Sequence, residues 1–212
     1  VSKVSESFLS YVSPMGIYET LYAFQDAFGK TMGEMGTHPW SQGFPLTTQL
    51  PGGPEMPTNV YLDAEDLKYP KAWGLPALRE AISSYYNHYY NAGIDCENVM
   101  VFSGGRPGLM AMLMFLQPDI NIRIASTEYT PYYDMLHLLQ RKYSLVDSHV
   151  DNHFFPSVLD YVNTGNFDRN LVMLSNPCNP TGVTRSGNEL KELVEKASYG
   201  SFGLLIDEAY EL

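Results

Sequence analysis

Residues 171–182, LVMLSNPCNPTG, and residues 203–210, GLLIDEAY, decide the fold of this chain. Each stretch begins with a short apolar run that predicts a buried strand, and each then turns polar, as expected of a loop. Between the two stretches, apolar residues recur at helical spacing and predict a helix over about residues 188–197. A strand, a helix and a second strand in this order predict two parallel strands joined by a crossover helix.

The same alternation extends toward the N-terminus of the chain. It predicts strands at residues 99–102, 122–125 and 144–150, and helices at residues 75–89, 132–140 and 156–162, with one more that follows Gly105 and runs through Leu116. This last helix is apolar nearly all round, so we expect it to be deeply buried. The predicted fold class is α/β, with a mostly parallel sheet and helices on both of its faces. Ligands of such sheets bind beyond the carboxyl ends of the strands.

The N-terminal part of the chain differs in character from the rest. A helix is predicted from Ile17 to about Met35, and Gly, Pro and polar residues dominate from Gly36 to Thr58. A loop-rich segment of this length is uncommon in a compact domain unless it has a functional role or packs against another surface. We therefore predict a division into an N-terminal arm and loop-rich segment, residues 1–58, and an α/β domain that begins at residue 59 and includes residue 212.

Composition and charge narrow the classes of function. The chain has 44% hydrophobic and 17% charged residues, which is enough to bury a core. Its net charge of −11 argues against binding to nucleic acid or to an anionic membrane surface. Two cysteines, Cys96 and Cys178, and five scattered histidines predict neither a disulfide scaffold nor a metal site. This cysteine usage favours a reducing compartment, and we expect a cytoplasmic location.

The first predicted strand is followed by SGGRPG, residues 103–108, at the start of a helix. The amides of Gly104 and Gly105 can approach a ligand closely, the helix N-terminus favours a phosphate, and Arg106 adds a charged donor. A purely structural turn is an alternative explanation of this motif. The spacing does not match that of a nucleotide triphosphate loop.

Three further strand ends carry residues suited to a planar ligand. Tyr129 could stack on such a ligand, although by itself it is better explained as a packing residue in a chain with 16 tyrosines. Asn179 lies in a loop that two Asn-Pro steps restrict, so its amide has a defined position. Asp207 follows an apolar strand and, if it points toward the ligand, needs a partner there, because a buried carboxylate without one is costly. Capping of the segment that follows is the alternative explanation of this residue.

Taken together, these stretches resemble the pyridoxal-phosphate-dependent aminotransferases of fold type I, class I/II. The resemblance lies in the NPxNPTG segment at residues 176–182, in DEAY at residues 207–210, and in the segment from Tyr69 through GLPALRE at residues 74–80. It covers the chain from about Gly43 to the end. The motifs are specific as an ordered set, whereas each alone is not.

The resemblance implies roles for particular residues toward pyridoxal 5'-phosphate. Asp207 would pair with the pyridine nitrogen, and Asn179 and Tyr210 would donate hydrogen bonds to the phenolic oxygen. Tyr129 would stack on the ring. The remaining implied roles are phosphate binding by Gly104, Gly105 and Arg106, a contact from Tyr69 to the phosphate of a neighbouring subunit in a homodimer, and substrate-carboxylate binding near Gly43.

The family's Schiff-base lysine follows its Asp-x-x-Tyr motif, whereas all seven lysines of this sequence precede Asp207. We therefore expect the catalytic lysine to lie outside these residues, and we interpret residues 59–212 as the front part of the family's large cofactor-binding domain, incomplete at its C-terminal side. The resemblance implies an aminotransferase that acts on an amino acid or a related amine, in amino-acid metabolism.

Three alternatives stay open at this point. An enzyme of the same fold could instead catalyse elimination, replacement, decarboxylation or cyclisation in a biosynthetic pathway, since the same motifs serve those reactions. A non-catalytic ligand-sensing module would be expected to carry a basic DNA-binding segment, and none is visible. A different α/β enzyme that binds a phosphorylated ligand through residues 103–108 would leave Asn179, Asp207 and Tyr210 unexplained. The sequence does not identify the amino donor or the acceptor.

Overall fold

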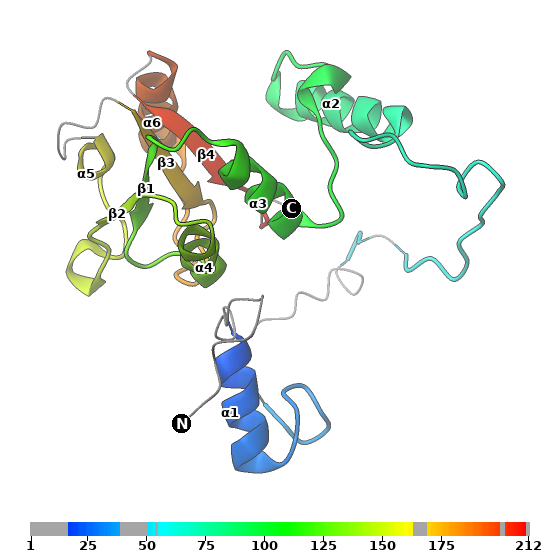
Figure 1. The fold of residues 1–212 in the computed structure, drawn as a ribbon, viewed down its shortest axis with the longest axis horizontal. Coiled ribbons are helices and arrows are strands. Elements are labelled where there is room, and N and C mark those ends of the chain that lie inside the picture. Colours follow the sequence, from blue (N-terminus) through cyan, green and yellow to red (C-terminus); the bar gives the residue numbers. More distant parts are fainter. Residues whose placement is uncertain (1–16, 39–50, 54, 163–168, 200–201, 211–212) are drawn as a thin grey trace, which may run out of the picture. The chain divides into compact units, whose positions relative to one another are not determined.

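The computed structural model describes residues 17–38, 51–53, 55–162, 169–199 and 202–210. These residues form two compact units, of which one is built mainly from Leu109–Leu212 and the other spans Phe24–Gly108. The first unit contains a β-sheet and is called the sheet unit below, and the second is called the α2 unit after its main helix (Figure 1).

Within the described residues, the sheet unit holds one parallel sheet of four strands. The strands are β1 (Asn121–Ala125), β2 (Tyr143–Val146), β3 (Asn170–Ser175) and β4 (Gly203–Asp207), in the order β2-β1-β3-β4. All pairs are parallel, and the register sets Ser175 opposite Asp207. The predicted α/β class and parallel sheet are therefore confirmed. The central strands β1 and β3 are buried on both faces. β3 is accordingly a nearly continuous apolar run, whereas β1 also buries Asn121 and Arg123.

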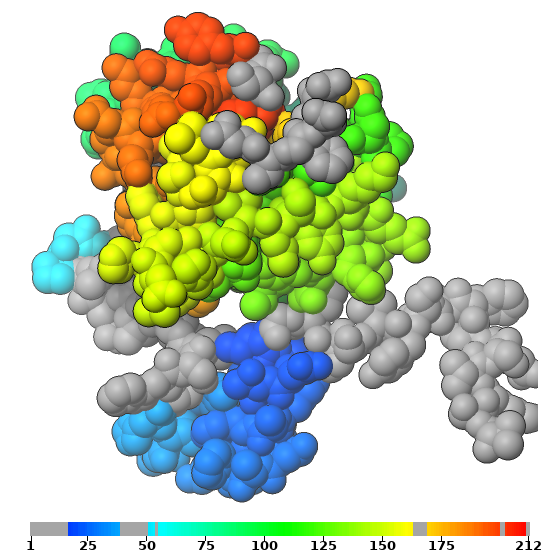
Figure 2. Space-filling model, turned by 90° about the vertical axis from the view of Figure 1, so that its left-hand side faces the viewer, coloured from blue at the N-terminus to red at the C-terminus, as the bar shows by residue number. Residues whose placement is uncertain are grey.

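Helices cover both faces of this sheet, as predicted (Figure 1). On one face, Ile122 and Ile124 of β1 pack with residues of α3 (Gly105–Phe115) and α4 (Thr130–Leu138). On the other face, Val172 and Leu174 of β3 pack with residues of α5 (Val158–Val162) and α6 (Gly187–Ser198). Figure 2 shows α5 in yellow and α6 in orange on the same side of the unit. Alternate residues of β1, β3 and β4 thus enter two separate cores.

The predictions for β2 and α3 were wrong in part. β2 ends at Val146 rather than at Val150, because the Asn152 side chain accepts a hydrogen bond from the His149 amide and donates one to the Asp147 carbonyl, which closes the 3-10 helix η3 (Val150–Asn152). In α3, Leu113 is buried but Met112, Met114 and Phe115 are 52%, 62% and 89% exposed. The sheet covers one side of this helix, so its apolar composition does not make it buried all round.

The α2 unit contains the predicted helix α2 (Pro76–Tyr90) and the 3-10 helix η2 (Cys96–Asn98). The buried Arg79 guanidinium fastens the two together, donating to the Val99 carbonyl at 2.8 Å and to the Cys96 carbonyl at 2.6 Å. The strand predicted at residues 99–102 is not formed in the described part of the chain. The Val101 amide donates to the Trp73 carbonyl and the Val99 amide makes a turn bond to the Cys96 carbonyl, but a strand needs a ladder of bonds to a neighbouring strand.

The N-terminal helix α1 (Tyr18–Phe28) is shorter than the predicted Ile17–Met35 helix. It stops at Gly29, whose φ of +65° is left-handed and ends the helical path. No helix among the described residues has both the length and the apolar character needed to cross a bilayer. The predicted division at residue 58 stays a prediction.

Candidate functional site

The candidate site lies at the carboxyl edge of the sheet, where β3 and β4 end side by side. Ser175 and Asp207 are the last residues of these strands and are paired in register. The Asn176 amide donates to the Asp207 carbonyl at 2.9 Å, which continues the pairing by one residue. The loop that carries Asn179 and the segment that carries Tyr210 therefore begin next to each other.

Asp207 is held by two donors. The Tyr132 hydroxyl donates to Oδ2 at 2.7 Å, and the Ala209 amide donates to Oδ1 at 3.1 Å. Tyr132 lies in the first turn of α4 and is fully buried. Burial, followed by the hydrogen bond to Asp207, raises the pKa of Tyr132, so this phenol stays protonated and acts as a fixed donor.

The other residues that are predicted to contact the cofactor ring lie at the same edge of the sheet. Asn179 Nδ2 donates to the Tyr210 hydroxyl at 3.0 Å, so these two side chains form a pair. The Tyr129 ring meets the Tyr132 ring edge to face, with centroids 5.2 Å apart and planes at 87°. Tyr129 thereby contacts the residue that binds Asp207. The structure joins Tyr129 to Asp207 through Tyr132, and Asn179 to Tyr210 directly.

A buried carboxylate, Glu128, lies directly before Tyr129 and is 4% exposed. Its Oε1 accepts from the Ser175 amide at 2.9 Å, while Oε2 accepts from the Ser175 hydroxyl at 2.6 Å and from the Tyr129 amide at 2.9 Å. Burial raises the pKa of Glu128, and the hydrogen bonds from Ser175 and Tyr129 oppose that rise. The donors thus offset part of the cost of burying the carboxylate, and its pKa stays raised.

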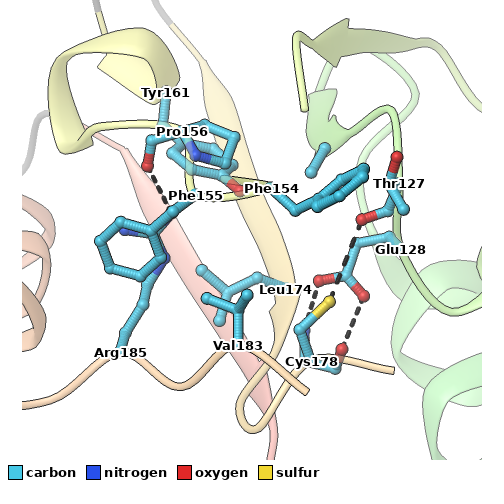
Figure 3. A pocket seen from close by; sticks show the side chains of 12 residues that line it. Thr127, Glu128, Phe154, Phe155, Pro156, Tyr161, Leu174, Cys178, Val183 and Arg185 are labelled. Carbon is cyan, nitrogen blue, oxygen red and sulfur yellow. Dashed lines mark hydrogen bonds between the residues drawn. The ribbon is translucent and has the colours of Figure 1, made fainter. Parts of the chain in front are cut away.

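A hollow lies beside Glu128, with Glu128 and Cys178 on one side and Arg185, Phe155 and Tyr161 on the other (Figure 3). The Arg185 guanidinium lies 4.1 Å from the Phe155 ring centroid and donates to the Pro156 carbonyl. Its backbone also exchanges two hydrogen bonds with the Asn176 side chain, at 2.7 and 3.1 Å. The Arg185 backbone thus fixes the loop after β3, while its guanidinium contacts Phe155 and Pro156.

The other predicted site residues belong to the α2 unit or lie outside the described residues. Gly104, Gly105 and Arg106 belong to the α2 unit, with Gly104 in a left-handed conformation (φ +105°) and Gly105 at the start of α3. Tyr69, in the same unit, is fully exposed. Gly43 lies outside the described residues. The phosphate, subunit and carboxylate roles of these residues stay predictions.

Two residues of the site, Tyr132 and Glu128, were missed by the sequence analysis. Both were within reach of sequence reasoning, because Glu128 directly precedes Tyr129 at a strand end and Tyr132 lies one helical turn beyond it. The spacing does not identify the residues that these side chains bind, since Tyr132 and Asp207, for example, are 75 residues apart in the sequence.

The donor set fits pyridoxal phosphate. Each Asp207 oxygen accepts one bond and has a second lone pair, so the carboxylate can still accept from a pyridine N–H. Asn179 and Tyr210 present an amide and a hydroxyl together, which suits a phenolic oxygen. Across the described residues, the structure shows no group of three or more His, Cys, Asp or Glu side chains that could hold a metal ion.

Comparison with known proteins agrees with this arrangement. A sequence model of the family described as aminotransferase class I and II matches residues 54–212. The aspartate aminotransferase of Sulfolobus acidocaldarius is 28% identical over 171 residues, which are 76% of this chain and 43% of that protein. The L-glutamine--4-(methylsulfanyl)-2-oxobutanoate aminotransferase of Bacillus subtilis is 25% identical over 170 residues, 75% of this chain and 43% of that protein.

Solved structures show the same fold. The aspartate aminotransferase of Thermus thermophilus with maleate superposes with a TM-score of 0.62 at 24% identity, over 68% of this chain and 38% of that one. The chain spans less than half the length of these relatives. Because the family model covers most of the chain, and because the parallel sheet has the aminotransferase fold, the chain belongs to the class I and II aminotransferase family.

Proposed function

We propose that the protein containing this chain is a pyridoxal-phosphate-dependent aminotransferase that acts on an amino acid. One observation carries the proposal. A carboxylate, Asp207, stands at the carboxyl end of β4, fixed by the buried Tyr132, at the same sheet edge as the Asn179–Tyr210 pair. An acceptor for a ring N–H and two groups suited to a ring oxygen are thereby brought to one edge.

The chain's own residues would bind and orient the ring. Asp207 would accept from the protonated pyridine nitrogen, and Tyr132 would hold Asp207 at the angle this bond needs. Asn179 and Tyr210 would donate to the phenolic oxygen, and Tyr129 would cover a ring face. When bound, pyridoxal phosphate supplies an electron sink for the charge that develops on the substrate's α-carbon.

The phosphate and the second subunit belong to the same proposal. Gly104 and Gly105 would bind the phosphate through backbone amides, and Arg106 through its charge. Tyr69 would reach the phosphate of a neighbouring subunit, so the protein would be a homodimer, and the loop near Gly43 would contact the substrate carboxylate. The full exposure of Tyr69 is compatible with a role outside its own subunit.

The substrate class and setting follow from chemistry and from the relatives. The relatives are named for transamination of aspartate and of glutamine, which supports an amino-acid substrate. We propose a role in amino-acid metabolism or biosynthesis, in a reducing compartment such as the cytoplasm, where Cys96 and Cys178 would stay free thiols.

The test is a half-reaction with the purified full-length protein and pyridoxal phosphate. The visible absorption of the bound cofactor should shift to that of pyridoxamine phosphate when a competent amino acid is added, and the matching oxo acid should appear. A screen of aspartate, glutamine, glutamate and alanine covers the first substrates to try. A bound cofactor with no pyridoxamine phosphate from any amino acid would contradict transamination and favour elimination, replacement or cyclisation. No cofactor binding would contradict the whole proposal.

A further inference from the structure

Glu128 is a buried acid to which the proposed function gives no task. Its two carboxylate oxygens face three donors, namely the Ser175 amide, the Ser175 hydroxyl and the Tyr129 amide. The two residues that supply these donors belong to different segments, because Tyr129 follows β1 and Ser175 ends β3. One side chain therefore ties together two of the loops at the candidate site.

The contact continues beyond Ser175. The Ser175 hydroxyl donates its proton to Glu128, and its oxygen accepts from the Asn179 amide at 3.1 Å. The Asn179 side chain in turn donates to Tyr210. A series of hydrogen bonds thus runs from Glu128 through the Ser175 hydroxyl to the backbone amide of Asn179. The side chain of the same residue is the one that the proposed function assigns to the ring oxygen. Glu128 and Ser175 are 4% and 7% exposed, so water has little access to the series.

We infer that Glu128 is a positioning residue that sets Tyr129 and, through Ser175, Asn179 relative to each other for cofactor binding. This inference rests on the proposed function. Glu128 makes no contact with the ring in this scheme. It acts by fixing the backbone on either side of the ring site, which preorganises the residues that touch it.

The two backbone amides, of Ser175 and Tyr129, each need an acceptor oxygen, and the Glu128 side chain presents one oxygen to each. A glutamine side chain of the same shape has one acceptor oxygen and one amino group. If the glutamine oxygen faces the Ser175 amide, the glutamine amino group faces the Tyr129 amide. If the side chain is turned the other way, the amino group faces the Ser175 amide. Glu128→Gln therefore leaves one backbone donor opposed in either orientation, with no change in volume. Ser175→Ala is the milder change, since it removes the hydroxyl and keeps the Ser175 amide bond to Glu128.

The first measurement uses the full-length protein without cofactor. Hydrogen exchange in the Asn179 peptide should become about tenfold faster for Ser175→Ala, because the Asn179 amide loses its acceptor. For Glu128→Gln, exchange should become faster in the Tyr129 peptide, where a backbone donor is opposed, and in the Asn179 peptide, because the Ser175 hydroxyl that accepts from Asn179 loses its own carboxylate partner. Ser144→Ala is the matched control. It removes a β2 hydroxyl that accepts from Asn121 at 3.0 Å near the opposite end of the strands, and it should leave both peptides unchanged.

The second measurement adds pyridoxal phosphate. We expect its Kd to rise about tenfold in Glu128→Gln and less in Ser175→Ala, by analogy with the loss caused by removing supporting partners of a site residue. The pH midpoint of the bound cofactor's visible absorption should also shift upward, in the direction of an Asn179→Ala variant, because a donor to the charged ring oxygen is displaced. A general loss of stability would not move this midpoint.

The outcomes separate the two claims. Parent protein that does not bind pyridoxal phosphate would contradict the proposed function, while the exchange data would still test the link from Glu128 to Asn179. Unchanged exchange at Asn179 in both variants would overturn the inference, as would faster exchange with parental Kd and absorption midpoint. If Glu128→Gln does not fold, Ser175→Ala decides the matter alone, with the same criteria.

Discussion

Tyr132→Phe is the sharpest single test of how the sheet edge holds Asp207. The substitution removes one oxygen atom and keeps the ring, so it opens little space in a core where Tyr132 is fully buried. The lost bond is the 2.7 Å contact from the hydroxyl to Asp207 Oδ2. A hydrogen bond to a charged group contributes about 1.5–3 kcal/mol to stability. Because Asp207 is partly exposed, water replaces part of the lost bond, so we expect the free energy of unfolding to fall by about 1.5 kcal/mol, the lower end of this range.

The assay has two arms on the full-length protein. Urea unfolding without cofactor measures the free energy of unfolding, and titration with pyridoxal phosphate measures the Kd. We expect the Kd to rise about tenfold, since about 1.4 kcal/mol corresponds to a factor of ten in affinity. The physical reason is that Asp207, freed from Tyr132, samples orientations that do not face the ring nitrogen, and binding must then fix it.

Tyr133→Phe is the matched control on the adjacent residue. The Tyr133 hydroxyl donates to the Ala125 carbonyl at 2.6 Å, a neutral acceptor away from Asp207. This variant should lose about 0.5–1.5 kcal/mol of stability and keep the parental Kd. Equal Kd values for both variants, or a parental Kd for Tyr132→Phe, would refute the argument that Tyr132 positions Asp207.

The remaining predictions concern the other site residues. Asp207→Ala should cut turnover far more than cofactor content, so a variant with parental turnover would contradict its assignment to the ring nitrogen. Arg106→Ala should weaken cofactor retention on dialysis by about ten- to a hundredfold, as expected for a lost charge-assisted bond, with a parental circular dichroism spectrum. Burial raises the pKa of Glu128 above its unfolded value, so the folded chain binds this proton more tightly. The parent's free energy of unfolding, relative to that of Glu128→Gln, should therefore be highest below the unfolded pKa and should fall as the pH rises through the raised pKa. Urea unfolding of both proteins between pH 4 and 8 measures this difference, and a difference that grew with pH would contradict the prediction.

Local patterns were enough to predict much of the architecture. The apolar runs of β1, β3 and β4 and the helical spacing of α2, α4 and α6 follow from side-chain periodicity, which depends on neighbours within a few residues. The position of Asn179 in the loop after one strand and of Asp207 at the end of another followed from the same patterns. Since ligands of parallel sheets bind beyond the carboxyl ends of the strands, the sequence also predicted that these residues belong to the ligand-binding edge.

Contacts between distant segments could not be predicted in this way. Tyr132, which binds Asp207, and Ser175, which binds Glu128, lie 75 and 47 residues away from these carboxylates, and only the packing of α4 and β3 against the rest of the unit brings them together. The apolar run at residues 99–102 lacks a strand ladder in the described chain, and α3 has one buried side although its residues are apolar on all sides. Periodicity therefore determined which segments become strands and helices and which residues stand at their ends. The tertiary structure decided which polar groups meet, because a hydrogen bond or a strand pair exists only when its partner is within about 3 Å, wherever that partner lies in the sequence.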